Sequence, residues 1–364
     1  MHVLLVGPTP RVFSAGNFQW FSDTARALRR LGHTTTLFPC PETWTASPAV
    51  TQRLEQRLLP LAGWLARYQE ALFRRRDRRL IRLARRLRPD LVLVLKGETL
   101  SGEVLAEVKR LAHGPLVTWW VDDPWRFPSS LERFALFDHV FVFDRSYVLR
   151  LEALGAKRVH FLPCACDETV YRPMRLTRGD QRDLGSDVAF VAWSYPEREA
   201  VVRALARAVD IGVWGGGWRN LETLRTGRGT PVVRGSAVST LTAARIYNAS
   251  RIGLNAHASQ TRLGGLNTRA FELLASGLFQ LVDRVAGIEQ LLTPDVEVVC
   301  YSSPDEARQL AKHYLADGEM RLRIATKGRA RVLEEHTYVC RMRTLCHAAR
   351  ETTSQRATGG EGTR

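Results

Sequence analysis

The stretch Asn267–Asp283 places a cation and an acid at the start of a predicted helix. Asn267 and Thr268 are good helix N-caps, so a helix of about two to three turns is expected to follow. Arg269 lies in its first turn, where a cation opposes the helix dipole unless an anion binds there. Glu272 lies one turn later on the same face, where a carboxylate can accept hydrogen bonds from both ribose hydroxyls. The pair indicates a nucleotide site, although an ordinary surface pair would have the same spacing.

Arg198 repeats this arrangement in another predicted helix, just after Tyr195 and Pro196. Two guanidinium groups near two helix N-termini are suited to holding a diphosphate. The alternative is that Arg198 pairs with the neighbouring Glu197 or Glu199 on the surface.

Three consecutive glycines, Gly215–Gly217, directly follow an apolar run, and Trp218 comes next. Glycine lets the backbone approach a ligand closely, so Gly215 and Gly217 are candidate donor-binding residues. Trp218 could stack on a nucleotide base. A simple turn followed by a core tryptophan is the alternative.

Asp122 and Asp123 follow an apolar run of strand type. Adjacent side chains diverge on an extended chain, so this pair is not spaced to hold a metal–diphosphate complex, and we expect no metal site. We interpret one of the two as a catalytic base or as an anchor for the acceptor. Because Asp123 precedes Pro124, a turn cap is the alternative for this residue.

Further polar residues follow other predicted strands. In doubly wound sheets, ligands bind beyond the carboxyl ends of the strands. His257 is a lone histidine, and such residues are more often structural. The sequence has no Ser-His-Asp order, P-loop, zinc motif or GxGxxG fingerprint. The remaining candidates are Lys96, Asp144 and His257 on the acceptor side or in the cleft, and Asn255 and Asn267 on the donor side.

Length and composition favour a folded, two-domain protein. The chain has 364 residues, is 45% hydrophobic, and has no apolar run of the roughly 18 residues that span a bilayer. The amino terminus is predicted to be a strand and lacks the features of a signal peptide. The six cysteines show no metal spacing and are interpreted as reduced thiols of a cytoplasmic protein.

The net charge of +16 is weaker evidence for a polyanionic partner than its size suggests. Five of the 53 basic residues are lysine and the rest are arginine, a skew that a GC-rich genome would give. The densest segment, Arg74–Arg88, has leucines at helical spacing and is predicted to be amphipathic. A solvated helix face is the simplest interpretation, and contact with an anionic membrane or with nucleic acid is the alternative.

Two series of short apolar runs alternate with predicted helices, which indicates parallel sheets covered on both faces. We expect an N-terminal Rossmann-like domain over 1–172 on the acceptor side and a linker over 173–187. A C-terminal Rossmann-like donor domain over 188–333 should follow, then a helix over 334–350 that can return to the N-terminal domain, and a disordered tail over 351–364. The predicted strands are His2–Val6, Thr34–Phe38, Leu91–Leu95, Leu116–Val121, His139–Phe143, Arg158–Leu162, Val188–Ala192, Asp210–Trp214, Val232–Val233, Ile252–Asn255, Leu278–Val282 and Val296–Tyr301.

Several of these blocks resemble the CgeB-type (spore-maturation protein) family of bacterial glycosyltransferases. The resemblance covers most of the chain from about 90 to 345 and is most specific over 247–283. The matching segments are LVLVLKG (91–97), WWVDDPW (119–125), FVFDRSYVLRLEALGAKRVHFLPCACD (141–167), FVAWSYPERE (190–199), IGVWGGGWR (211–219), YNASRIGLN (247–255), NTRAFELLASGLFQLVD (267–283) and EVVCYSSPDEARQLAKHYLADGEMR (297–321).

The resemblance implies the GT-B architecture, in which two Rossmann-like doubly wound domains face each other across a cleft. It also implies a nucleotide-sugar co-substrate, no separate cofactor and no required metal. Glu272 would contact the donor ribose, and Arg198 and Arg269 its diphosphate. Related retaining enzymes carry a second glutamate eight positions earlier, where this chain has Gly264.

We therefore predict a cytoplasmic glycosyltransferase, which could also lie at the inner membrane face. One rival hypothesis is a non-catalytic protein of the same fold that binds nucleotide sugars. Another is a glycosyltransferase that acts on nucleic acid, with the arginines of 74–88 gripping phosphates. The sugar, the base and the acceptor do not follow from the sequence.

Overall fold

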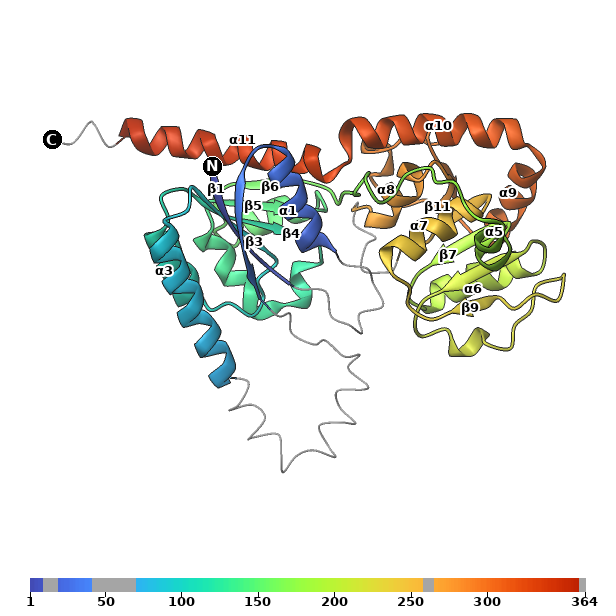
Figure 1. The fold of residues 1–364 in the computed structure, drawn as a ribbon, viewed down its shortest axis with the longest axis horizontal. Helices are drawn as coiled ribbons and strands as arrows, with labels where there is room; N and C mark the ends of the chain where they lie inside the picture. Colours follow the sequence, from blue (N-terminus) through green and yellow to red (C-terminus); the bar gives the residue numbers. More distant parts are fainter. Residues whose placement is uncertain (9–18, 41–69, 258–264, 360–364) are drawn as a thin grey trace, which may run out of the picture.

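The computed structural model describes residues 1–8, 19–40, 70–257 and 265–359, and side chains as far as residue 351. Within these ranges the chain forms two six-stranded sheets (Figure 1). All pairings between the named strands are parallel. The predicted pair of parallel sheets is confirmed.

The N-terminal sheet has the strand order β2-β1-β3-β4-β5-β6. Its strands are short apolar runs, and β3 is buried at each of its five positions. Such strands need cover on both faces, which the intervening helices provide. The strands are β1 (His2–Gly7), β2 (Thr34–Pro39), β3 (Leu91–Leu95), β4 (Leu116–Trp120), β5 (His139–Val142) and β6 (Val159–Phe161).

The C-terminal sheet has the order β12-β11-β10-β7-β8-β9. The central strands β7, β10 and β11 are mostly apolar and almost entirely buried. The strands are β7 (Val188–Val191), β8 (Ile211–Trp214), β9 (Val233–Gly235), β10 (Ile252–Asn255), β11 (Phe279–Asp283) and β12 (Val299–Tyr301).

Helices cover both sheets. Within the segment predicted as a linker, Thr177 and Asp180 form a capping box that starts α5 (Arg178–Leu184). The segment 70–87 is helical, as its periodicity predicts. The other α-helices with named bounds are α1 (Trp20–Arg30), α3 (Gly102–Leu111), α4 (Tyr147–Glu152), α6 (Pro196–Ala206), α7 (Thr240–Ala249), α8 (Thr268–Ala275), α9 (Pro304–Ala316), α10 (Gly318–Glu335) and α11 (Tyr338–Gly359).

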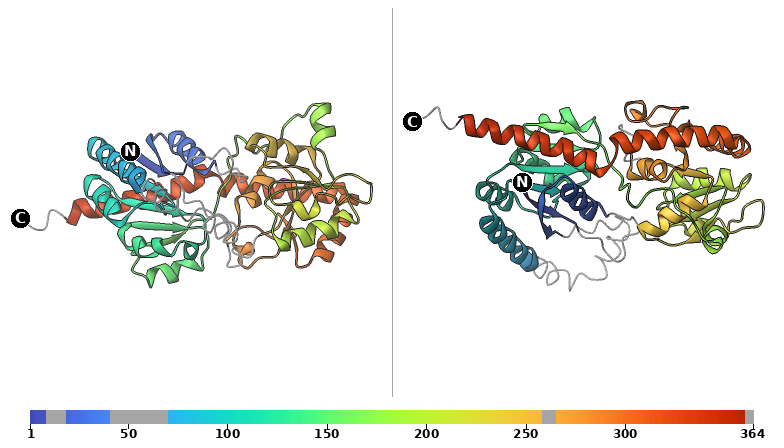
Figure 2. Two further views of the ribbon diagram at one scale, coloured as in Figure 1. Left: turned by 90° about the horizontal axis from the view of Figure 1, so that it is seen from below. Right: turned by 45° about the horizontal axis from the view of Figure 1, so that its top comes forward.

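The last two helices run along both halves of the molecule. Figure 2 shows α10 beside the C-terminal sheet and α11 beside the N-terminal sheet. Tyr338, Met342 and Leu345 of α11 are buried in the same cluster as Trp20 and Leu28 of α1. The helix thus completes the core of the N-terminal half. It continues to Gly359, through most of the segment predicted to be a disordered tail.

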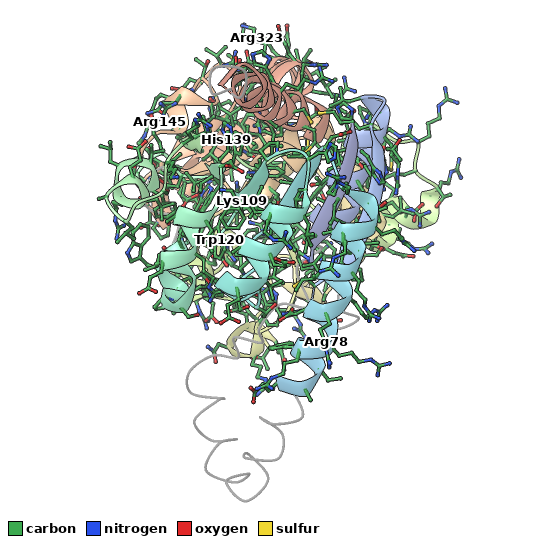
Figure 3. The ribbon with its side chains drawn as sticks, turned by 90° about the vertical axis from the view of Figure 1, so that its left-hand side faces the viewer. Arg78, Lys109, Trp120, His139, Arg145 and Arg323 are labelled. Carbon is green, nitrogen blue, oxygen red and sulfur yellow. The ribbon has the colours of Figure 1, made fainter. Side chains whose placement is uncertain are left out.

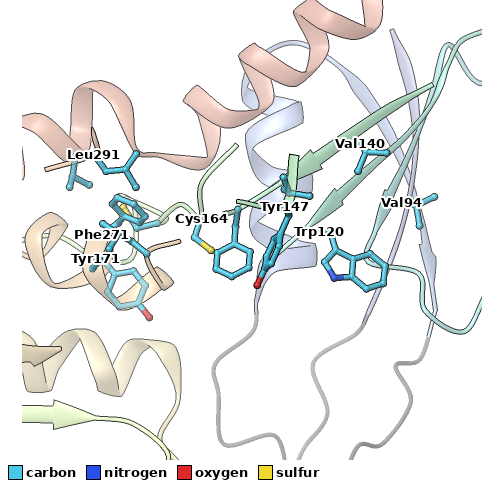
Figure 4. Close-up of a cluster of buried hydrophobic side chains, with 14 of the residues drawn as sticks. Val94, Trp120, Val140, Tyr147, Cys164, Tyr171, Phe271 and Leu291 are labelled. Atoms are coloured by element: carbon cyan, nitrogen blue, oxygen red, sulfur yellow. The ribbon is translucent and has the colours of Figure 1, made fainter. Parts of the chain in front are cut away.

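A single apolar cluster joins the two halves. It contains Val94 and Trp120 from the N-terminal sheet, and Phe271 and Leu291 from the C-terminal half (Figure 4). Tyr171, in the segment that connects the sheets, also belongs to it. The halves therefore share buried apolar surface, which stabilises their mutual arrangement.

The chain passes between the halves twice, and the two passages lie side by side. Cys166 on the first passage forms a parallel bridge with Thr337 on the second. Arg341 donates hydrogen bonds to the carbonyls of Pro163 (2.8 Å), Cys164 (2.9 Å) and Glu335 (2.6 Å). One buried guanidinium thus ties both passages together.

Candidate functional site

The strongest candidate site lies where β7 and β10 are neighbours in the C-terminal sheet. From β7 the chain continues through α6 to β8, and from β10 it continues through α8 to β11, on opposite sides of this pair. Such a switch in direction opens a crevice at the carboxyl ends of the strands. The N-termini of α6 and α8 both lie at this edge, and each carries one of the predicted arginines.

Arg198 lies in the first turn of α6 and is only 7% exposed. Its Nε donates to the carbonyl of Ala256 (2.8 Å), and its Nη1 donates to the carbonyl of Trp193 (3.0 Å). The guanidinium also lies over the ring of Tyr195, 4.9 Å from its centre. The surface pairing with Glu197 or Glu199 is therefore not what the structure shows, because Arg198 turns inward.

Arg269 lies in the first turn of α8 and is partly buried. Its Nε donates to the carbonyl of Val191 (2.8 Å), and its Nη1 donates to Oδ1 of Asn255 (3.2 Å). It also makes a side-chain hydrogen bond with Tyr247. Arg269 thus spans the ends of both strands that border the crevice.

The two guanidinium groups converge. Their central carbons lie 5.9 Å (Arg198) and 5.3 Å (Arg269) from the centre of the Phe190 ring. Burial, and then the charge of Arg269, lower the pKa of Arg198 to about 10, so Arg198 is still charged at neutral pH. In the part of the chain that the structure describes, neither makes an ion pair with a carboxylate. Two like charges held together, with no direct ion pair to a carboxylate in the described part of the chain, favour binding of an anion.

A hydrogen-bonded network fixes the N-terminus of α8. Asn267 caps the helix through the amide of Ala270 (3.1 Å). Its side-chain amide exchanges two hydrogen bonds with Asn255 (3.0 and 3.1 Å). Asn255 is fully buried and also accepts the bond from Arg269. These donor-side candidates form one connected unit.

His257 holds the N-terminus of α8 in place through a hydrogen bond with Asn267. Its Nδ1 lies 2.7 Å from Oδ1 of Asp283, and its Nε2 accepts the backbone N–H of Asn267 (3.3 Å). An acceptor at Nε2 requires the proton of the neutral ring on Nδ1, where Asp283 holds it. His257 therefore positions the helix end, in line with the structural interpretation of a lone histidine. Sequence reasoning did not identify Asp283 as its partner.

The glycine turn after β8 packs against the loop after β7. Gly215 has a φ of +143°, and a Cβ there would lie 1.9 Å from the carbonyl oxygen of Ala192. Gly217 also has a positive φ, of +83°. The turn thus needs glycine for close approach of two backbone segments. Tyr195 and Trp193 of the neighbouring loop are 39% and 44% exposed and could meet a ligand.

Trp218 is buried in the core and is not available to stack on a nucleotide base. It is 2% exposed, packs edge-on against Phe190, and donates its indole N–H to the carbonyl of Ala192 (2.8 Å). The alternative of a core tryptophan describes this residue. Trp193, which the sequence analysis did not single out, is the exposed aromatic ring beside the glycine turn.

Glu272 lies near Arg269 and faces the junction between the two halves. It makes side-chain hydrogen bonds with Thr268 and Tyr171. It also lines a small cavity with Asp23 of α1 and Thr240 of α7. Burial raises the pKa of Glu272 to about 7, against the lowering effect of Arg269. Burial likewise raises the pKa of Asp23 to about 7.

A second polar cluster lies at the carboxyl ends of β3 and β4. Nζ of Lys96 is 3.5 Å from Oδ2 of Asp122, and it lies 4.1 Å from the centre of the Phe127 ring. Oδ1 of Asp122 accepts a hydrogen bond from Arg126 (3.0 Å). Asp122 thus pairs with two cations that fix its position, an arrangement suited to anchoring an acceptor hydroxyl. Asp123 caps the following short 3-10 helix through the amide of Trp125 (2.9 Å).

Asp144, at the end of β5, connects this cluster with the donor side. It is fully buried, and one of its oxygens accepts the backbone N–H of Gly265 (2.8 Å). The position predicted to differ from the related enzymes, Gly264, lies outside the described residues. Among the described residues no group of three or more His, Cys, Asp or Glu side chains is arranged to hold a metal ion. In the same residues, no helix is long and apolar enough to cross a bilayer.

Comparison with known proteins agrees with this architecture. Residues 198–347 match the family model described as glycosyl transferase-like. No curated protein matches the sequence of the chain significantly. Among solved structures, HepE from Anabaena in complex with UDP-glucose is 16% identical with a TM-score of 0.61, and the match covers 96% of this chain and 99% of HepE.

Two further structures have the same fold. Sucrose-phosphate synthase from Thermosynechococcus elongatus is 14% identical, with a TM-score of 0.63 over 97% of this chain and 99% of that one. An alpha-glucosyltransferase in complex with UDP and a 13-mer DNA is 10% identical, with a TM-score of 0.61 over 95% and 98%. The GT-B fold class is thus confirmed, and the findings support the prediction of a glycosyltransferase enzyme.

Proposed function

We propose that this protein transfers a sugar from a nucleoside-diphosphate sugar to an acceptor hydroxyl, and that Arg198 and Arg269 bind the diphosphate. The convergence of these two guanidinium groups at the β7–β10 edge, with no direct ion pair to a carboxylate among the described residues, carries the proposal. A guanidinium has five N–H donors, and carbonyls take two of those on Arg198. The remaining donors can bind phosphate oxygens.

In this reaction the bond between the anomeric carbon and the diphosphate oxygen breaks. The acceptor oxygen forms the new bond to that carbon, and its proton passes to the departing diphosphate, which keeps the electron pair of the broken bond. Negative charge grows on the leaving diphosphate, and fixed cations at two helix ends stabilise it without reorganisation. We propose that these groups take the place of a metal, so that chelation of divalent cations leaves the activity unchanged.

The nucleoside is proposed to lie beside the glycine turn, with Trp193 and Tyr195 as the available aromatic rings. Complexes of HepE with UDP-glucose and of the DNA-bound alpha-glucosyltransferase with UDP make uridine the first base to test. Asp122 is proposed to hold the acceptor hydroxyl. Glu272 is proposed to bind the ribose of the nucleotide sugar. The ribose hydroxyl would take the place of Thr268 or Tyr171, to which Glu272 is hydrogen-bonded in the structure.

The finer assignments of the sequence analysis stay part of this proposal. They are membership of the CgeB-type group, a cytoplasmic location and the domain limits at 172, 188 and 333. A protein that only binds nucleotide sugars is the rival hypothesis, and one measurement separates it from the proposed transferase. It predicts that the nucleotide sugar binds but that no nucleoside diphosphate is released, even when cell extract supplies acceptors.

Calorimetry with UDP and UDP-glucose tests the site. Arg269→Ala should weaken binding by about 10- to 100-fold, the effect of losing charge-assisted hydrogen bonds. Arg203→Ala is the matched control, because Arg203 is an exposed arginine on α6 that bonds only to the carbonyl of Asn220 among the described residues. Equal affinities of the two variants would contradict the proposed site.

A further inference from the structure

The described part of the helix over residues 70–87 has one face made almost entirely of arginine. Arg75, Arg78, Arg79, Arg82 and Arg86 are all exposed. At 100° per residue they fall within about 100° of arc, and they extend over about 17 Å of the helix axis. We define these five residues as the arginine face. It lies in the N-terminal half, on a different element from the candidate donor site.

The charges of this face are not compensated within the described residues. Two ion pairs involve arginines at the border of the face, Arg74 with Glu70 and Arg85 with Glu107, and a third joins Arg76 and Asp77 on the other side of the helix. None of the five residues of the arginine face makes an ion pair in the described ranges. Like charges one turn apart repel each other, so the face stabilises the fold less than a mixed surface would.

The opposite side of the same helix anchors it to the N-terminal half. Leu80 and Ala84 are fully buried in the core. Arg76, also buried, donates to the hydroxyl of Thr99 and to its carbonyl oxygen, both at 2.8 Å. The helix is therefore a fixed support, and its arginine face points outward because its other side is packed. Figure 3 shows Arg78 at the outer edge of the molecule.

We propose that the arginine face binds the surface of an anionic phospholipid bilayer. Its charge is complementary to a plane of lipid phosphates, which a straight helix can meet along its length. One exposed apolar side chain favours a membrane over nucleic acid as the partner. Leu72 is 46% exposed and precedes Arg75 and Arg79 by three and seven residues, so it lies at the border of the face. An interfacial helix inserts such a side chain among the headgroups, whereas a phosphate backbone gives it no contact.

This inference is independent of the proposed sugar transfer. It predicts that the protein lies on an anionic membrane with its donor site on another part of its surface. The charges act together, so removal of several should have a larger effect than removal of one.

Sedimentation with lipid vesicles tests the proposal. The full chain is mixed with vesicles of phosphatidylglycerol and phosphatidylcholine, or of phosphatidylcholine alone. We expect binding to the anionic vesicles only, and release by high salt. The variant R78E/R79E/R82E should bind at least about 100-fold more weakly, at roughly a factor of five for each arginine lost. Leu72→Ser should weaken binding by a smaller factor.

The control variant R203E/R207E/R225E carries the same change of charge on exposed arginines of the C-terminal half. It should sediment like the unchanged protein, and both variants should keep the same thermal unfolding temperature. If the unchanged protein does not bind, or the two triple variants lose binding equally, the proposal is wrong. If the protein binds a DNA or RNA duplex more tightly than anionic vesicles at the same salt concentration, the arginine face is a nucleic-acid-binding surface and the membrane proposal is wrong.

Discussion

Oδ2 of Asp144 accepts the backbone N–H of Gly265 at 2.8 Å, and this bond joins the end of β5 to the chain that enters α8. The other oxygen accepts both the amide (2.9 Å) and the hydroxyl (2.6 Å) of Ser146. A Cβ at Gly265 would lie 2.4 Å from the ring of Phe143, so the contact also needs a glycine. The two halves therefore meet through a buried carboxylate close to the candidate donor site.

Asp144→Asn should destabilise this junction. An asparagine side chain has one acceptor oxygen and one amide donor. Either the N–H of Gly265 or the N–H and hydroxyl of Ser146 would therefore face the amide donor in place of an acceptor. We expect a loss of about 1–3 kcal/mol in the free energy of unfolding, measured with urea. Ser146→Ala is the control, because it removes only the hydroxyl bond and should cost less. Equal stability of Asp144→Asn and the unchanged protein would contradict the role of this bond.

Asp283→Asn should weaken donor binding through the position of α8. Asp283 now accepts both the backbone N–H of His257 (2.9 Å) and the proton on its Nδ1. Asparagine has a single acceptor oxygen, so one of these two N–H groups would face an amide donor. This disturbs the position and tautomer of the ring whose Nε2 accepts the amide of Asn267. We expect about tenfold weaker binding of UDP by calorimetry with a small change in unfolding temperature. A large loss of stability with unchanged affinity would show that Asp283 is purely structural.

Two tryptophans near the glycine turn should behave differently. Trp193 is 44% exposed, so Trp193→Ala should leave stability nearly unchanged and weaken nucleotide binding if the base lies there. Trp218 is 2% exposed and hydrogen-bonded, so Trp218→Ala should cost about 3–5 kcal/mol of stability. Unfolding and calorimetry on both variants separate the two effects. Loss of nucleotide binding only in a folded Trp218 variant would overturn this assignment.

The carboxyl groups at the junction should make stability fall as the pH rises. The pKa of Glu272 is about 7 in the folded protein against an ordinary value of 4.5, mainly because the group is buried. Between these values the folded state binds more protons than the unfolded state, so the free energy of unfolding decreases with pH and then levels off above about 7. Asp23 acts in the same direction, from 3.8 to about 7.

Glu272→Gln removes this share of the pH dependence. At pH 8 the variant should gain roughly 1–3 kcal/mol over the unchanged protein, and near pH 4 the difference should vanish. Urea unfolding at several pH values measures it. Glu289→Gln, at a side chain that is 56% exposed and paired with Arg284, is the control and should show no such trend. A difference that is constant with pH would contradict a raised pKa of Glu272 in the folded protein.

The strands were the most predictable part of the structure. Leu91–Leu95 is apolar throughout, and Ile252–Asn255 is apolar up to its last residue, because both sheet faces are covered. The observed bounds of both strands match the predicted ones. The arginines at the starts of α6 and α8 could be found because a cation there opposes the helix dipole. The capping box that starts α5 was also visible in the sequence, but its polar composition made the segment look like a linker.

The partners of the site residues could not be predicted in the same way. His257 and Asp283 are 26 positions apart and meet because β10 and β11 are neighbours. The orientation of Glu272 depends on Tyr171 and Asp23, which come from other parts of the chain. Trp218 follows three glycines whether its ring is exposed or buried. Such details are set by packing between elements, which local patterns do not contain.

The tie that Arg341 makes between the two chain passages limits how the halves can move. Two connections that lie side by side and are bonded to each other restrict how one half can turn relative to the other. An opening that separates Asp144 from Gly265 has to break the hydrogen bond between them. A chain cut before Tyr338 would lose this guidance and would also leave the apolar surface of Trp20 and Leu28 uncovered.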